Sequence, residues 1–276
     1  MMKKILILLM FLGFSNWVHA GLNEADKAYK AGNYDLVFNE LKPLAEQGNP
    51  EAQYKLGVLF DAGQGVVRDP KQAFFWHHQA AIQGYVKAQY NLGWMYFNGN
   101  GVAQDYAQAL LWYKKSAAQG YASAYVGLGY MYDAGLGGVA QSDKQSAAWY
   151  RKAAELGNTD GQFNLGILYA LGRGVPQDYK KSLFWHKKAA VQGDVEAIQN
   201  IGVRYKLGQG VKLNVVTAYT LFELASSLAP NYEEATFNSN STAELLSEKQ
   251  IQESKALAQA IKKNFPSALD QYLKTH

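Results

Sequence analysis

Apolar residues recur along the chain at helical spacing, in units that follow one another at a nearly constant interval. The sequence marks each unit with an apolar residue followed by glycine, and the apolar member falls at Leu56, Leu92, Leu128, Leu165 and Ile201, which are 36, 36, 37 and 36 residues apart. A second series runs through Trp76, Trp112, Trp149 and Trp185, with Leu221 in the fifth place. A period of this length is typical of stacked supersecondary units that bury their apolar faces against one another.

Each unit carries the signals of two helices. In the second unit Ala88, Leu92 and Tyr96 share one helical face, and the run Gly99-Asn100-Gly101 ends that helix. A residue with a side-chain oxygen then follows in every unit, and the predicted caps of the second helix are Asp69, Asp105, Asp143, Asp178 and Asn214. The second helices carry the tryptophans and end at Gly84, Gly120, Gly157 and Gly193.

The glycine of the Leu-Gly pair lies inside the first helix of each unit. A glycine there costs ~1 kcal/mol relative to alanine, so its fivefold recurrence indicates close packing at that position. The whole pattern predicts an all-α chain of tandem helix-turn-helix units.

The motif Leu-Gly-x-x-Tyr, then Gly-x-Gly-Val, then Asp, Ala, Trp and Lys-Ala-Ala-x-x-Gly resembles the Sel-one-like repeat (SLR), a relative of the tetratricopeptide repeat. The resemblance implies an α-solenoid. We expect an N-terminal half-repeat or cap at 21–50, five repeats at 51–86, 87–122, 123–159, 160–195 and 196–229, and a C-terminal helical cap at 230–276. In that cap, Ser247 and Gln250 predict a capping box and a helix to about Lys263, whereas residues 239–242 are typical of a loop.

The first twenty residues have the features of a secretory signal peptide. Lys3 and Lys4 precede an apolar run at residues 5–14, and small residues at Val18 and Ala20 predict cleavage after Ala20. A membrane anchor is the alternative, but spanning a bilayer takes about 20 apolar residues, so we expect no stable membrane insertion after cleavage. This predicts a periplasmic or secreted protein.

Composition narrows the possible chemistry. The chain has no cysteine, which excludes disulfides, a thiol nucleophile and a lipoprotein anchor. The net charge of +4 is too small for a nucleic-acid-binding surface, so no nucleic acid partner is expected.

The histidines and aspartates that repeat along the chain have structural explanations. His77 and His186 occupy the position after Trp that holds Tyr113 and Tyr150 in other units, which favours an aromatic packing or surface role over metal ligation. Helix capping explains the recurrent aspartates, and the Ser-x-x-Lys, Ser-Asp-Asn and Lys-Thr-Gly motifs are absent. We therefore expect no catalytic residue, no metal site and no cofactor.

In tetratricopeptide-type repeats the first helix of each unit lines the concave side. Carried over to this chain, that arrangement selects the partner-binding aromatics Tyr54, Tyr90, Trp94, Phe97, Tyr130 and Phe163, with Lys87, Asn98 and Asp133 as a polar rim. Trp94 stands out because the corresponding positions hold Val58 and Tyr130 in the neighbouring units. The alternative is that these rings only pad successive first helices.

The resemblance implies a non-catalytic protein-protein interaction scaffold or adaptor of the bacterial cell envelope that binds another protein or a peptide. Two alternatives remain open. One is a periplasmic immunity or inhibitor protein that neutralises a toxin enzyme, and the less favoured one is an envelope hydrolase of the β-lactamase kind.

Overall fold

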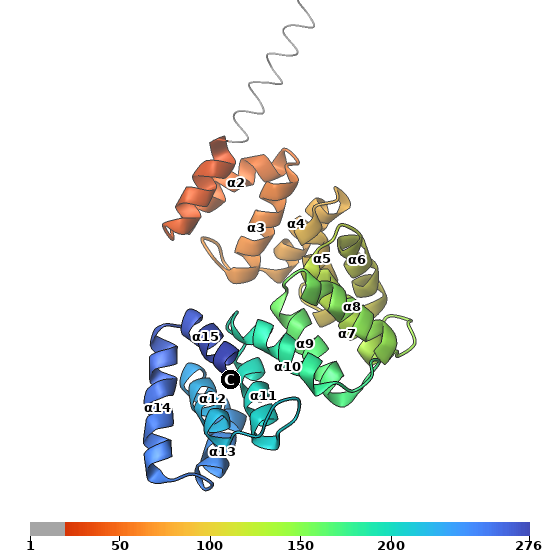
Figure 1. The fold of residues 1–276 in the computed structure, drawn as a ribbon. Coiled ribbons are helices and arrows are strands. Elements are labelled where there is room, and N and C mark those ends of the chain that lie inside the picture. The colour runs from red at the N-terminus through yellow and green to blue at the C-terminus, as the bar shows by residue number, and fades with distance from the viewer. Residues whose placement is uncertain (1–19) are drawn as a thin grey trace, which may run out of the picture. The chain divides into compact units, whose positions relative to one another are not determined.

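The computed structural model describes residues 20–276, and every regular element in that range is an α-helix (Figure 1). A helix at residues 20–30 comes first. The others are α2 (Tyr34–Glu46), α3 (Pro50–Ala62), α4 (Pro70–Ile82), α5 (Val86–Asn98), α6 (Tyr106–Ala118), α7 (Ala122–Ala134), α8 (Asp143–Glu155), α9 (Thr159–Leu171), α10 (Tyr179–Ala190), α11 (Val195–Leu207), α12 (Val215–Leu228), α13 (Glu233–Ala243), α14 (Glu248–Lys263) and α15 (Ser267–Thr275). The prediction of an all-α chain of helical pairs is confirmed, whereas the predicted signal peptide lies almost wholly outside the described residues.

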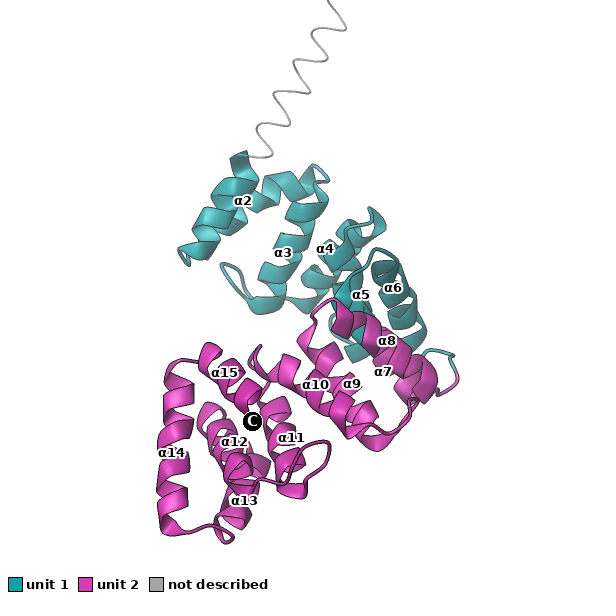
Figure 2. Cartoon of the chain, viewed as in Figure 1, with its two compact units in different colours: residues 1–127, 136–139 teal, residues 128–135, 140–276 magenta. Residues whose placement is uncertain are grey.

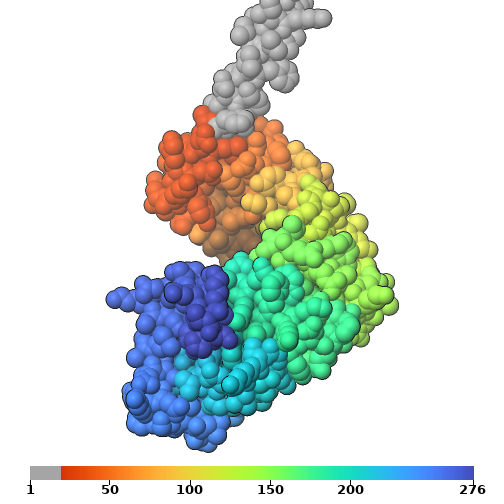
Figure 3. Space-filling model, viewed as in Figure 1, coloured from red at the N-terminus to blue at the C-terminus, as the bar shows by residue number. Residues whose placement is uncertain are grey.

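The chain forms two compact units (Figure 2). Unit 1 comprises residues up to 127 together with 136–139, and unit 2 comprises 128–135 and 140–276. Within unit 1 the pairs α3·α4 and α5·α6 pack closely, and within unit 2 the pairs α9·α10 and α11·α12 do so. The space-filling view shows a closed surface over neighbouring segments within each unit (Figure 3). No helix among residues 20–276 combines the length and the apolar composition needed to cross a bilayer.

Four of the five predicted caps hold the second helices as expected. The side chains of Asp69, Asp105, Asp178 and Asn214 each accept a hydrogen bond from a backbone N–H in the first turn that follows. The prediction is wrong for Asp143. Ser142 is the N-cap of α8, because its hydroxyl accepts from the Gln145 N–H, and Asp143 stands one residue later in the first turn. There its carboxylate forms an ion pair with Arg173 at 2.6 Å.

The glycine of each Leu-Gly pair faces an aromatic ring, which is the close packing that the sequence predicted. A Cβ atom on Gly57, Gly93, Gly129, Gly166 or Gly202 would come within 2.4–2.8 Å of the ring of His77, Tyr113, Tyr150, His186 or Phe222, respectively. These rings occupy the position after the tryptophan series and are buried. The tryptophan series itself contributes less to the core, since Trp76, Trp149 and Trp185 are only half-buried.

Gly202→Ala should therefore destabilise the chain even though alanine is the better helix former. The added methyl would lie 2.6 Å from the Phe222 ring. Overpacking of this kind costs ~1–3 kcal/mol, and the helical gain of ~1 kcal/mol offsets only part of it, so the expected net loss is up to ~2 kcal/mol. Urea denaturation measures the loss. The double variant with Phe222→Ala should lose less than the sum of the two single losses, and full additivity would contradict a direct clash.

The Gly-x-Gly loops rest on the preceding repeat. Gly101 has a left-handed φ of 71°, and a Cβ there would lie 2.0 Å from the Pro70 carbonyl oxygen at the start of α4. Likewise, a Cβ on Gly174 would lie 2.1 Å from the Asp143 carbonyl oxygen at the start of α8. The loop after one first helix thus covers the beginning of the second helix of the repeat before it.

Glutamine side chains join repeats within each unit. The Gln89 Nε2 donates to the Ala81 carbonyl at 3.2 Å, and the Gln119 Nε2 donates to the Gln89 Oε1 at 2.8 Å. Gln162 and Gln192 repeat the arrangement in unit 2. These bonds satisfy polar groups in the core and fix the spacing of neighbouring helices.

Two of the C-terminal helices, α13 and α14, pack on α12, and α15 packs on α14. The predicted capping box of Ser247 and Gln250 is confirmed, as is the helix that ends at Lys263. The loop predicted at residues 239–242 is wrong, because α13 runs from Glu233 to Ala243. Ser239 and Thr242 are buried in this helix, and their hydroxyls donate to the Glu223 carboxylate and the Asn238 carbonyl. Satisfied hydroxyls remove the cost that would otherwise exclude these residues from a buried helix.

Candidate functional site

All six predicted partner-binding aromatics lie on first helices. Tyr54 is on α3, and α5 carries Tyr90, Trp94 and Phe97, all in unit 1; Tyr130 on α7 and Phe163 on α9 belong to unit 2. Trp94 and Tyr130 are exposed by 41% and 49%, whereas the other four rings are half-buried. The exposed rings are thus the two that stand two residues after the leucine of a Leu-Gly pair.

The half-buried rings contact the second helices of their own repeats. Tyr54 packs on His77 with ring centroids 5.5 Å apart, Tyr90 packs on Tyr113 at 5.7 Å, and Phe163 packs on His186 at 5.7 Å. Phe97 packs on Tyr106 at 5.2 Å. These rings therefore support their repeats and remain partly exposed.

In unit 1 these rings belong to a larger aromatic surface. Tyr54 lies 5.1 Å from Tyr85, and Tyr90 lies 5.4 Å from Tyr121, between ring centroids. Burial, followed by the neighbouring hydroxyls of Tyr121, Tyr85 and Tyr29, raises the pKa of Tyr54, which places those hydroxyls near it. We call this surface the aromatic face: Tyr29, Tyr54, Tyr85, Tyr90, Trp94 and Tyr121.

Trp94 is the largest exposed member of the aromatic face. It follows Tyr90 by one helical turn, and its backbone carbonyl accepts a hydrogen bond from the Asn98 Nδ2 at 2.9 Å. Lys87 and Asn98, two of the predicted rim residues, are exposed on the same helix. The third predicted rim residue, Asp133 in unit 2, forms an ion pair with Arg173 at 2.6 Å.

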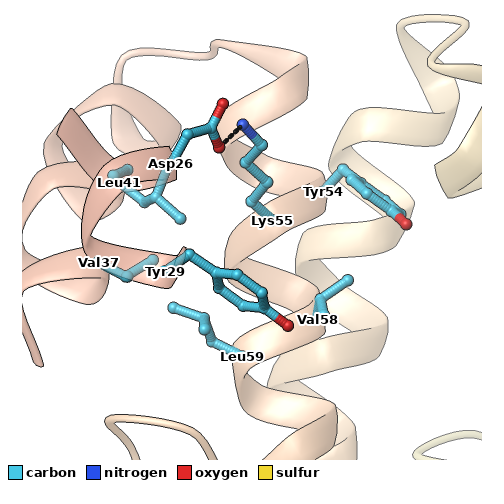
Figure 4. Close-up of a pocket in the computed structure, with 9 residues that line it drawn as sticks. Asp26, Tyr29, Val37, Leu41, Tyr54, Lys55, Val58 and Leu59 are labelled. Atoms are coloured by element: carbon cyan, nitrogen blue, oxygen red, sulfur yellow. Dashed lines mark hydrogen bonds and ion pairs between the residues drawn. The ribbon is translucent and has the colours of Figure 1, made fainter. Parts of the chain in front are cut away.

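A pocket opens at the N-terminal part of the aromatic face, among the helix at residues 20–30, α2 and α3 (Figure 4). Its volume is about 240 Å³, and its lining is mostly apolar. The residues that line it are Ala25, Asp26, Tyr29, Val37, Leu41, Tyr54, Lys55, Val58 and Leu59. Of these, the sequence singled out only Tyr54. The helical spacing of Leu22, Ala25 and Tyr29 was the signal that could have pointed to the rest.

Asp26 and Lys55 line one side of this pocket, and Glu51 is joined to them through Lys55. The Lys55 Nζ lies 2.6 Å from an Asp26 oxygen and 2.8 Å from a Glu51 oxygen. Burial alone would lower the pKa of Lys55, but the hydrogen bonds to both carboxylates outweigh it and raise that pKa. Lys55 therefore stays charged at neutral pH, between two carboxylates.

The buried histidines are packing residues. His77 and His186 are each 0% exposed, and burial lowers the pKa of each ring to about 4. The Asn91 Nδ2 lies 3.3 Å from the His77 Nε2, whereas neither nitrogen of His186 makes a hydrogen bond of good geometry. The predicted packing role of this position is confirmed. Across residues 20–276 there is also no cluster of three or more His, Asp or Glu residues suited to a metal ion.

Tandem helical pairs whose second helices pack their rings against glycines of the first helices define a repeat protein of the α-solenoid class. The Sel1 repeat model matches residues 50–85, 86–121, 122–158, 159–194 and 195–230, so the chain belongs to the Sel1 repeat family. A search of curated proteins gave no match.

Several solved structures are similar over most of the chain, and two of them are more than a quarter identical to it over the matched residues. A protective antigen of uropathogenic Escherichia coli with an SLR fold is 34% identical, with a TM-score of 0.83 over 94% of this chain and 56% of that one. The present chain thus spans little more than half of that antigen's length. A Sel1 repeat protein from Oxalobacter formigenes is 28% identical, with a TM-score of 0.70 over 81% of this chain and 99% of that one.

Proposed function

We propose that this chain is a non-catalytic protein-protein interaction scaffold of the bacterial cell envelope, and that its partner, a protein or a peptide, binds the aromatic face. The observation that carries the proposal is the 41% exposed indole of Trp94 among five tyrosines in one unit. Trp and Tyr offer large contact areas at low conformational cost, which is why they dominate interface hot spots. Membership of the Sel1 repeat family supports a scaffold role. In unit 2, Tyr130 occupies the repeat position of Trp94, and Phe163 occupies that of Tyr90.

The proposed compartment is the periplasm or the cell exterior. It is supported by the N-terminal sequence, in which a short cationic segment and an apolar run precede Ala20. Cleavage after Ala20 would leave a chain beginning at Gly21, one residue into the first described helix.

Trp94→Ala tests the proposed face. We expect capture of a partner from an envelope extract to weaken by about 30-fold, since hot-spot tryptophans contribute roughly 2 kcal/mol or more. The melting temperature should stay within about a degree, because a 41% exposed ring contributes little to the core. Quantitative pull-down followed by mass spectrometry measures the loss. Phe97 is a half-buried ring next to the aromatic face, on the same helix as Trp94, so adding Phe97→Ala should abolish capture. It should also cost some stability, because Phe97 packs on Tyr106.

Phe75→Ala is the matched control for that experiment. Phe75 is 47% exposed on α4, a second helix of the same unit, outside the aromatic face. Its removal should leave capture unchanged. Equal capture by the Trp94→Ala variant and the parent chain would contradict the proposal.

A further inference from the structure

The pocket beside α3 has a buried apolar floor and one charged side. Ala25, Val37, Leu41 and Leu59 are each at most 2% exposed, so they form the floor. Tyr29 is 46% exposed, and its ring extends from the helix at residues 20–30 toward Val58 of α3 (Figure 4). Lys55 reaches across to Asp26 on the same side of the pocket in that view.

The size of the pocket suits one large side chain. An apolar cavity of roughly 150 Å³ holds a benzene ring, and this pocket has about 240 Å³. Its floor would exclude water from an aromatic ring or a leucine, and burying such a side chain contributes about 1.5–3 kcal/mol. A polar ligand would find few partners on that floor.

The charged groups beside the pocket determine which residue of the ligand can lie next to that side chain. Asp26 and Glu51 bring two negative charges against the single positive charge of Lys55. The Lys55 ammonium is already paired with both carboxylates, so an incoming anion would have to displace one of them. An incoming cation adds a favourable contact to a cluster with excess negative charge.

We propose that this pocket receives an aromatic or leucine side chain of a partner peptide, and that the carboxylates of Asp26 and Glu51 bind a lysine or arginine next to it in that peptide. The inference rests on the proposed function, and it specifies the anchor that the aromatic face holds at its N-terminal part. The apolar residue supplies affinity, and the basic residue supplies orientation and selectivity.

Selection of random heptapeptides displayed on phage, with the purified chain as bait, tests this assignment. The enriched peptides should share an aromatic residue or leucine adjacent to lysine or arginine. Each is then synthesised with a fluorescent label, and its affinity is measured by anisotropy. Enrichment of acidic peptides, of peptides without a large apolar residue, or of none would overturn the proposal.

Variants of the pocket locate the binding. Val58→Trp should fill the opening and weaken the selected peptides at least tenfold, while Asp26→Asn with Glu51→Gln should reduce the preference for lysine over glutamate at least fivefold. Tyr29→Ala is a second wall variant in case the tryptophan impairs folding, because a 46% exposed ring can be removed without unfolding the chain. Full affinity in both wall variants would overturn the assignment.

The two proposals fail in different ways. If Trp94→Ala weakens the selected peptides and Val58→Trp does not, the aromatic face binds peptides without this anchor, and the inference is wrong while the proposed function stands. If the pocket variants weaken the peptides while Trp94→Ala leaves partner capture intact, the pocket assignment stands and the role proposed for Trp94 is wrong.

Discussion

Gly101→Ala is expected to lower the free energy of unfolding by about 3 kcal/mol. Gly101 has φ of 71°, where alanine costs about 1–2 kcal/mol, and the new Cβ would lie 2.0 Å from the Pro70 carbonyl oxygen. Because that obstacle is backbone at the start of α4, no side-chain rotation relieves it, and the loop must move away from the preceding repeat. Urea denaturation followed by circular dichroism measures the loss.

Gly120→Ala is the matched control, since it shares the strain and lacks the clash. Gly120 has φ of 81°, and no heavy atom lies within 4 Å of a Cβ built there. Its substitution should therefore cost only the left-handed conformation, about 1–2 kcal/mol. Equal losses in the two variants would show that the contact between the loop and α4 contributes nothing to stability.

Acid should destabilise the chain between pH 6.5 and about pH 4 through His77 and His186. Burial lowers the pKa of each ring from 6.5 to about 4, so the unfolded chain binds more protons than the folded chain in this window. Stability is therefore fully present above pH 6.5 and falls as the pH decreases. At about 1.4 kcal/mol per pH unit, each histidine removes roughly 3 kcal/mol by pH 4.

Replacing both histidines by phenylalanine should flatten that dependence. Phenylalanine already occupies this position in the fifth repeat, where Phe222 packs on Gly202. The single variant His186→Phe should also raise the free energy of unfolding at neutral pH. The reason is that it removes from the core two ring nitrogens that make no good hydrogen bond. Melting temperatures recorded from pH 4 to pH 8 measure the effect.

Tyr113→Phe serves as the control for the acid experiment. It changes the same position in a repeat that has tyrosine there, and burial raises the pKa of Tyr113 far from this pH window. Its acid dependence should match that of the parent chain. If the melting temperature of the double histidine variant still falls with decreasing pH as steeply as that of the parent chain, His77 and His186 are not the cause of the acid sensitivity.

The sequence predicted the candidate site only in part. The repeat spacing placed Tyr54, Tyr90 and Trp94 on first helices because equivalent positions of a repeat fold alike. Periodicity alone could not show that Trp94 stays exposed while Tyr54 and Tyr90 pack on second helices. Periodicity also could not predict the pocket, since Tyr29 and Lys55 are 26 residues apart and meet only when two helices pack.

The sequence by itself determined the elements of this protein. Helical spacing, caps such as Asp69 and Asp105, and stop signals such as Gly99 act over one or two turns, so local physics suffices to read them. Only the tertiary structure decided that Asp143 pairs with Arg173, that Ser239 and Thr242 lie in a buried helix, and that the ring after each tryptophan fills the space above a glycine. Those outcomes depend on contacts between helices, where burial and hydrogen bonds outweigh local preference.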